Sequence, residues 1–149
     1  MLKIRRIVVP TDFSADAAHA YEVATDLAGL LGAEITLLHC YQINPGGISP
    51  YGIVLPEKID QELRDAALSQ LDGWREKAAG DGVTVQTRLM SVAPSLGIAS
   101  CVKELGADLI VMGTRGLSGI QHVLLGSVAE RTVRTATCPV LTVKAPDAE

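Results

Sequence analysis

Glycines and one serine between residues 113 and 130 have the spacing of a loop that binds anions. This stretch reads Gly-Thr-Arg-Gly-Leu-Ser-Gly-Ile-Gln-His-Val-Leu-Leu-Gly-Ser-Val-Ala-Glu, after an apolar run at 108–112 that predicts a buried parallel strand. Ser127 and Glu130 have the spacing of a capping box, which predicts a helix with Ser127 as its N-cap. Glycines let a backbone approach a ligand, and the amides of a first helical turn attract negative charge. The stretch therefore predicts a cradle for phosphate, and a flexible loop with an ordinary helix cap is the alternative.

Other motifs for catalysis or metal binding are missing from the sequence. There is no Gly-x-x-x-x-Gly-Lys-Ser/Thr, no Gly-x-Gly-x-x-Gly and no Gly-x-Ser-x-Gly. The three histidines are dispersed, and none is placed to activate a water molecule. The three cysteines are widely spaced, which is typical of buried apolar side chains and not of a disulfide framework or a zinc site. We expect no catalytic residue and no metal held by the protein, with slow ATP hydrolysis as the most that the chain could perform.

The elements that position this loop follow from hydrophobic periodicity and from Gly and Pro signals. Strands are expected at 3–9, 34–40, 83–89, 108–112 and 138–144. Helices are expected from Ser14 as an N-cap to about 31, at 57–79, from Pro94 to 105, and from Ser127 to about 137. The second helix is expected to bury one stripe of side chains: Ile59, Leu63, Ala67, Leu71, Trp74 and Ala78.

Alternating strands and helices predict an α/β fold, a single doubly wound five-stranded parallel sheet with helices on both faces. The third strand alternates apolar and polar residues, as an edge strand does, so the strand order 3-2-1-4-5 fits best. In that order the first and fourth strands are neighbours at the point where the winding reverses. Ligands of such sheets bind beyond the strand ends there, which here are Pro10–Asp12 and Gly113 onward. The topology and the glycine pattern predict the same site.

The glycine spacing also resembles that of a known family. Gly113, Gly116 and Gly126-Ser127 match the G-2x-G-9x-G-S motif of the ATP-binding branch of the universal stress protein family. Stretches at 7–14, 37–40, 107–113 and 138–143 extend the resemblance over essentially the whole UspA-like chain. It implies an adenine nucleotide alpha hydrolase-like fold, ATP (or AMP or ADP) as ligand, Mg²⁺ held through the phosphates, and a homodimer through strand 138–144. One departure is Val92-Ala-Pro94, where the family commonly has Gly-x-Pro, and Val92 is expected to narrow the site.

The resemblance and the chemistry of the residues together assign roles. The glycine loop would hold ribose and phosphates, while the residues matching Pro10–Asp12 and Cys40 would lie near the adenosine. Asp12 suits an adenine amino group or a ribose hydroxyl, and a turn-forming role is the alternative. Arg115 is left open between phosphate and solvent. The expected nucleotide-binding residues are Pro10, Thr11, Asp12, Cys40, Met112, Gly113, Thr114, Arg115, Gly116, Gly126, Ser127 and Val128.

Composition limits the function classes. A chain of 149 residues with 48% apolar residues is expected to form one domain at 1–145, with 146–149 as a frayed tail. A net charge of −4 argues against a nucleic-acid partner, and no apolar run is long enough to cross a membrane. We expect a cytoplasmic, nucleotide-binding stress-response protein with signalling partners that the sequence does not name. A dimeric interaction protein without nucleotide, or a slow ATPase, is the alternative. The Pro- and Gly-rich stretch 41–56 is expected to be a lid or a partner contact, with a plain connector as the alternative.

Overall fold

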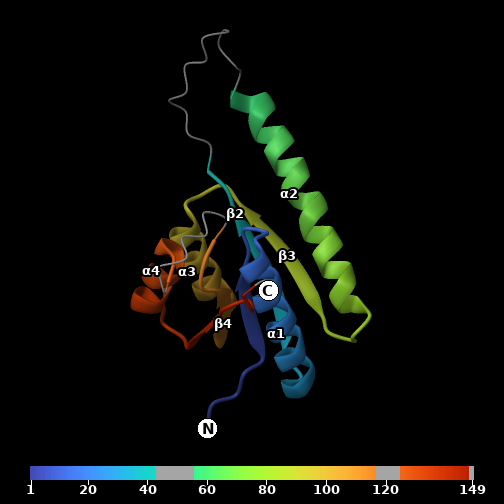
Figure 1. Ribbon diagram of the computed structural model, residues 1–149, viewed down its shortest axis with the longest axis vertical. Coiled ribbons are helices and arrows are strands. Elements are labelled where there is room, and N and C mark those ends of the chain that lie inside the picture. The colour runs from blue at the N-terminus through green and yellow to red at the C-terminus, as the bar shows by residue number, and fades with distance from the viewer. Residues whose placement is uncertain (43–55, 117–124, 148–149) are drawn as a thin grey trace.

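The computed structural model describes residues 1–42, 56–116 and 125–147. In this part of the chain a parallel sheet runs between two layers of helices (Figure 1). Its strands are β1 (Arg6–Pro10), β2 (Glu34–Cys40), β3 (Val85–Met90), β4 (Leu109–Gly113) and β5 (Val140–Val143). Its helices are α1 (Ala15–Leu31), α2 (Pro56–Ala79), α3 (Pro94–Leu105) and α4 (Ser127–Thr135).

The strands are ordered β3-β2-β1-β4-β5, and every pair of neighbours is parallel. This order confirms the prediction, including the place of β3 at one edge of the sheet. The neighbours β1 and β4 pair at Ile7 with Leu109 and at Val8 with Ile110. The chain therefore reverses its winding direction between these two strands, as the sequence analysis expected.

Two apolar clusters cover the two faces of the sheet. Ile7 and Val9 of β1 belong to one cluster with side chains of α1 and α2, while Val8 belongs to the other with side chains of α3 and α4. This separation follows from the period of two in a strand, which sends successive side chains to opposite faces. The helices therefore lie on both faces of the sheet, as predicted.

Local signals fix several helix ends. The Ser14 hydroxyl accepts a hydrogen bond of 3.2 Å from the amide of Ala17, so Ser14 is the N-cap of α1 as expected. Gly32 and Gly106 end α1 and α3 in the left-handed conformation, with φ of 67° and 61°. Pro94 is the first residue of α3, a position where its missing N–H costs no helical hydrogen bond.

Some predicted boundaries and one buried position were wrong. The first strand begins at Arg6 and reaches Pro10, and the third strand spans Val85–Met90. Leu63 was expected in the buried stripe of α2 but is 45% exposed. The physical reason is that the first half of α2, to which Leu63 belongs, extends past the end of the sheet (Figure 1). Periodicity alone could not show where the sheet ends.

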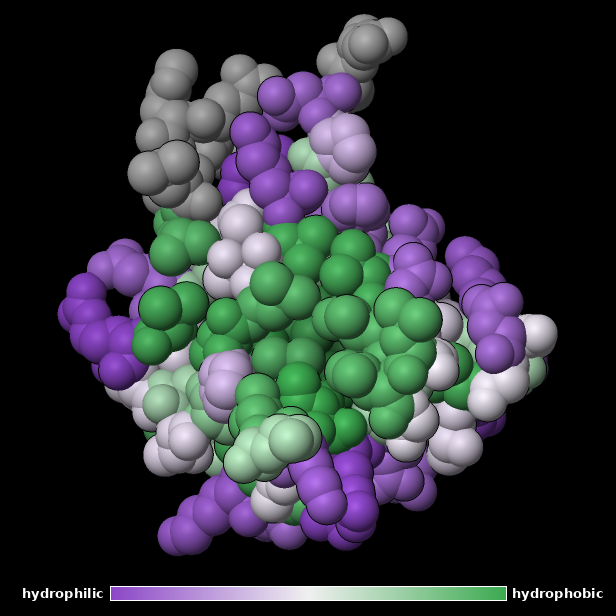
Figure 2. Space-filling view, turned by 90° about the horizontal axis from the view of Figure 1, so that it is seen from below, coloured by the Kyte–Doolittle hydropathy of each residue, from purple (hydrophilic) through white to green (hydrophobic). Residues whose placement is uncertain are grey.

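The surface of the described residues is mixed in polarity. Figure 2 shows apolar side chains gathered in the middle of one face, with polar side chains around them. No helix in the described ranges is both long enough and apolar enough to cross a bilayer. All three cysteines lie in the described part of the chain and are present as thiols.

Candidate functional site

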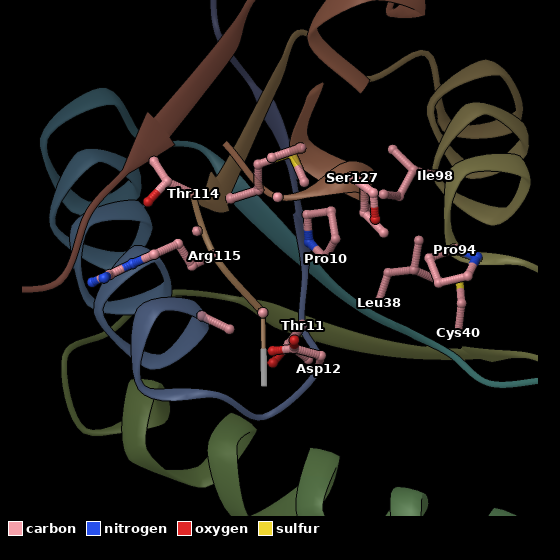
Figure 3. Close-up of a pocket in the computed structure, with 17 residues that line it drawn as sticks. Pro10, Thr11, Asp12, Leu38, Cys40, Pro94, Ile98, Thr114, Arg115 and Ser127 are labelled. Carbon is pink, nitrogen blue, oxygen red and sulfur yellow. The ribbon is translucent and has the colours of Figure 1, made fainter. Parts of the chain in front are cut away.

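A cavity of about 340 Å³ opens where β1 and β4 end (Figure 3). The carboxyl ends of these strands, the start of the glycine-rich loop, and the first turns of α3 and α4 surround it. This is the crevice at which the winding of the sheet reverses, the general location of ligand sites in open α/β sheets.

The structure brings together all of the residues that the sequence analysis assigned to the site. Those that line the cavity are Pro10, Thr11, Asp12, Cys40, Met112, Gly113, Thr114, Arg115, Gly116, Gly126, Ser127 and Val128. Sequence reasoning missed further lining residues, which are Ala17, Leu38, Pro94, Ile98 and Ala129. A signal existed for Leu38, because residues two apart in a strand share a face and Cys40 was already assigned. The sequence analysis had treated the other missed residues as ordinary helix positions.

The first turn of α4 presents backbone amides to the cavity. Gly126, not Ser127, is the N-cap of this helix, and no side chain caps it. The predicted capping box was therefore wrong. The physical reason is that the Gly126 amide donates a hydrogen bond of 2.6 Å to the carbonyl of Thr114, which starts the helix one residue after Gly126. The amides of Ser127, Val128 and Ala129 precede the first intrahelical hydrogen bond and carry the positive end of the helix dipole.

Two glycines of the motif sit where a side chain would not fit. A Cβ on Gly113 would lie 2.9 Å from the carbonyl carbon of Asp16 and 3.1 Å from the amide nitrogen of Ala17. The end of β4 therefore packs directly on the first turn of α1. A Cβ on Gly116 would lie 2.7 Å from an Asp12 carboxylate oxygen. The glycines thus let the two loops approach one another at the cavity.

The loop from Pro10 to Ser14 holds Asp12 at the cavity. The Thr11 amide donates a hydrogen bond of 2.8 Å to the carbonyl of Leu38, and the Asp12 carboxylate accepts one of 2.9 Å from the amide of Ser14. Asp12 therefore forms a turn before α1, as the alternative interpretation expected, and it also lines the cavity. Its expected contact with an adenine amino group or a ribose hydroxyl stays a prediction.

Phe13 adopts a backbone conformation that is rare for a residue with a side chain. Its φ is 64°, and it is the only described non-glycine residue with positive φ. Its ring contacts His39, with centroids 4.6 Å apart, and meets Trp74 edge-on at 5.4 Å. His39 Nδ1 in turn lies 2.7 Å from the carbonyl oxygen of Thr11. These aromatic contacts hold the loop that carries Asp12.

Asp16, which sequence reasoning missed, binds the start of the glycine-rich loop. Its Oδ2 accepts hydrogen bonds from the Arg115 amide (3.1 Å), from Arg115 Nε (3.2 Å) and from the Thr114 hydroxyl (3.3 Å). Arg115, left open between phosphate and solvent, is therefore ion-paired with a carboxylate. No sequence signal could have shown this contact, because 99 positions separate the two residues.

Cys40 gives the cavity a neutral, apolar side. Burial is the main cause that raises the pKa of the Cys40 thiol to about 11, and Cys101 nearby adds to it. The thiol is therefore protonated at neutral pH. Cys40 also packs against Gly97, where an added Cβ would collide with its sulfur. Val92 packs against Gly97 too and is not among the residues that line the cavity. The side chain that replaces the usual glycine thus points into the contact with α3.

Comparisons with known proteins agree with this architecture. Residues 3–144 match the universal stress protein family. Universal stress protein MJ0531 of Methanocaldococcus jannaschii is 35% identical over 146 residues, which cover 97% of this chain and 85% of the relative. The solved hypothetical protein MJ0577 superposes with a TM-score of 0.85 at 24% identity, covering 98% of this chain and 99% of its own. A universal stress protein solved in complex with cAMP superposes with a TM-score of 0.72 at 26% identity, covering 95% of this chain and 98% of its own.

The doubly wound parallel sheet with a cavity at its winding reversal defines an α/β protein of the open-sheet class. The match over nearly the whole length specifies it further. The chain belongs to the universal stress protein family.

Proposed function

We propose that this universal stress protein binds an adenine nucleotide, ATP, ADP or AMP, in the cavity between β1 and β4. The observation that carries the proposal is the first turn of α4, whose amides at Ser127, Val128 and Ala129 meet the cavity beside glycines that leave no room for a Cβ. Such amides bind phosphate oxygens, because they lack intrahelical acceptors and lie at the positive end of the helix dipole. The Ser127 hydroxyl does not cap the helix and adds a donor.

The adenosine end would lie toward Asp12 and Cys40. The Asp12 carboxylate accepts hydrogen bonds, which suits an adenine amino group or a ribose hydroxyl. Leu38, Pro94 and Ile98 line the cavity near Cys40 and provide apolar contact for a planar base. A related universal stress protein was solved in complex with cAMP, which contains an adenine and one phosphate, and this supports an adenine nucleotide as the proposed ligand.

Magnesium enters the proposal only as an ion carried by the phosphates. Within the described ranges no group of three or more His, Cys, Asp and Glu residues could hold a metal ion. Asp12 is one carboxylate at the cavity, which is fewer than a dedicated magnesium site needs. The protein side of the proposal is therefore binding and orientation of the nucleotide.

The proposed biological role is regulatory, in the cytoplasm. We propose that residues 1–145 form the nucleotide-binding domain and that nucleotide occupancy changes how the protein meets its signalling partners during stress. Nucleotide hydrolysis is not part of this proposed role. Slow ATP hydrolysis and a dimeric interaction protein without nucleotide stay as the competing hypotheses.

A homodimer through β5 is part of the same proposal. β5 is the outer strand on its side of the sheet, and its Leu141 is 38% exposed. An uncovered apolar edge strand can pair with another chain, and a second copy provides a matching edge. Sedimentation of the wild type is expected to show a dimer, and Leu141→Lys is expected to shift it to a monomer. A monomeric wild type would contradict the dimer and leave nucleotide binding standing.

The experiment for nucleotide binding is mass analysis of small molecules released from freshly purified protein, followed by calorimetric titration. The wild type is expected to release or bind an adenine nucleotide. Gly126→Val is expected to abolish binding, because a Cβ there already lies 3.4 Å from the Thr114 carbonyl and larger branches would extend over the first turn of α4. Gly73→Ala is the matched control, because an added Cβ meets nothing within 4 Å there. Unchanged binding by Gly126→Val would mean that the phosphates lie elsewhere.

A further inference from the structure

One peptide group joins the first turn of α1 to the first turn of α4. We infer that Asp16 is a positioning residue for phosphate binding, because it holds one end of the peptide group between Thr114 and Arg115. The other end of this group holds the N-cap of α4. This inference rests on the proposed function and adds to it the residue that keeps the phosphate-binding amides in place.

The peptide group between Thr114 and Arg115 is bound on both sides. Its N–H, which belongs to Arg115, donates a hydrogen bond of 3.1 Å to Asp16 Oδ2. Its carbonyl, which belongs to Thr114, accepts a hydrogen bond of 2.6 Å from the Gly126 amide. A trans peptide group is planar and rigid, so its N–H and its C=O point in opposite directions and turn together. The bond that Asp16 makes on one side therefore fixes the direction of the Thr114 carbonyl on the other.

Asp16 is held firmly enough to act as an anchor. Its side chain is 8% exposed, and it lies in the first turn of α1, where the helix dipole stabilises a carboxylate. The same Oδ2 also accepts hydrogen bonds from Arg115 Nε at 3.2 Å and from the Thr114 hydroxyl at 3.3 Å. In Figure 3 the Arg115 side chain extends toward α1 and away from Ser127. Asp16 thus binds two successive residues at the start of the glycine-rich loop.

The Gly126 amide leads directly to the amides that we propose to bind phosphate. Gly126 is the N-cap of α4, and a Cβ there would lie 3.4 Å from the Thr114 carbonyl oxygen, so the loop and the helix start are in close contact. The next two residues, Ser127 and Val128, line the cavity, whereas Asp16 is not among the described residues that line it. Asp16 therefore acts on a bound phosphate through the first turn of α4 and not by contact.

Charge and position predict opposite effects of removing Asp16. Loss of its carboxylate releases the Arg115 guanidinium, which by charge alone would tighten the binding of a phosphate. Loss of its hydrogen bonds lets the peptide group turn, which displaces the first turn of α4 and weakens the same binding. We expect the second effect to prevail, because hydrogen bonds weaken steeply with misalignment and several amides of α4 move together. The sign of the change therefore distinguishes a positioning role from an electrostatic one.

The first experiment is calorimetric titration of the purified full chain with AMP and with adenosine, which has the same base and ribose but no phosphate. Asp16→Ala is expected to weaken AMP binding about tenfold, as the loss of one charge-assisted hydrogen bond does, and to change adenosine binding less than about twofold. Equal or tighter AMP binding would overturn the positioning role. An equal loss for AMP and adenosine would overturn it too, because a merely structural effect lowers both.

Amide hydrogen exchange measured by NMR tests the same role without a ligand. In Asp16→Ala the Gly126 amide is expected to exchange about tenfold faster than in the wild type, because its acceptor is no longer fixed. The Ala107 amide, which is bound to the Val102 carbonyl at 3.0 Å after α3, should keep its rate. An unchanged rate at Gly126, or equal rises at both amides, would overturn the positioning role. A wild type that binds no AMP, ADP or ATP would instead overturn the proposed function.

Two further variants complete the test. Asp16→Asn keeps the shape of the side chain and a neutral acceptor, so its effects should have the same direction and a smaller size. Asp26→Asn, at an exposed position of the same helix, is the matched control for a lost carboxylate and should leave both affinities unchanged. An effect of Asp26→Asn as large as that of Asp16→Asn would overturn the role of Asp16. If Asp16→Ala does not fold, Asp16→Asn decides by the same two measurements.

Discussion

The backbone of Phe13 offers a test of how the loop that carries Asp12 is built. Phe13 has a φ of 64°, a region where a side chain clashes with the following carbonyl and which glycine adopts without strain. Its ring contacts with His39 and Trp74 offset this strain in the folded protein. Replacing Phe13 by Ala removes the ring and keeps the strain, whereas replacing it by Gly removes both.

The expected difference between the two variants follows from these terms. Loss of two aromatic contacts destabilises both variants by about 1–3 kcal/mol relative to the wild type. The left-handed conformation costs alanine about 1–2 kcal/mol. Glycine has more freedom than alanine in the unfolded chain, which lowers the stability of the glycine variant by roughly 0.4–1 kcal/mol. From the middle values of these two ranges, Phe13→Gly is expected to be more stable than Phe13→Ala by about 0.8 kcal/mol.

Urea unfolding followed by far-UV circular dichroism measures this difference. Tryptophan fluorescence is less suitable, because Trp74 contacts Phe13 and its signal changes with the substitution itself. With a slope of about 2 kcal/mol per molar urea, the midpoints should differ by roughly 0.3–0.5 M. Ala66→Gly is the matched control, because Ala66 is exposed within α2 and has ordinary helical geometry. There glycine should be less stable than alanine by about 1 kcal/mol.

The sign of the difference decides the outcome. The expected outcome is a glycine variant more stable than the alanine variant at position 13 and less stable than it at position 66. This outcome would show that the strain is a property of this loop. Alanine at least as stable as glycine at position 13 would refute the reasoning, because the strain of the positive φ would then be no larger than the roughly 0.4–1 kcal/mol that glycine loses through its freedom in the unfolded chain.

Three further predictions follow from single contacts. Gly113→Ala should lower the free energy of unfolding by about 1–3 kcal/mol, because its Cβ would meet the backbone of Asp16. Gly73→Ala, where the added Cβ meets nothing within 4 Å, should not lower this free energy, and thermal melts compare the two variants. Backbone amide donors lower the pKa of Asp108, so the stability it contributes is present above its ordinary value of 3.8 and is lost as pH falls. The difference in free energy of unfolding between the wild type and Asp108→Asn should therefore shrink from pH 7 to pH 3. A difference that stays constant would contradict the lowered pKa of Asp108. With a pKa of about 11, Cys40 should be roughly a thousandth thiolate at pH 8. Its labelling by iodoacetamide, measured by peptide mass analysis, should therefore be slow. Rapid labelling at pH 8 would contradict the raised pKa.

Much of the fold could be predicted because its signals are local. The alternation of elements, the parallel order and the edge position of β3 follow from periodicity and from the rules of strand connection. Ser14, Gly32 and Gly106 could be assigned as helix ends because each acts within a few residues of its own position. The exposure of Leu63 could not be predicted, because the pattern of a helix does not contain the length of the sheet beneath it.

The candidate site could also be predicted in part. Its location followed from the glycine spacing and the winding reversal, and the residues assigned to it line one cavity. The capping of α4 could not be predicted from Ser127 and Glu130, because the Gly126 amide is fixed by the carbonyl of Thr114 on the other side of the loop. A capping box is a local pattern, and here a contact from outside the helix overrides it.

The sequence by itself determined which elements form, how the sheet is ordered, and where glycines let the backbone approach a ligand. Only the tertiary structure decided the charge of the site, by placing Asp16 of α1 against Arg115 across 99 positions of the chain. It also decided the strained backbone of Phe13, which depends on rings from β2 and α2. The physical reason is that periodicity and caps act within a few residues, whereas ion pairing and burial depend on which side chains folding brings together.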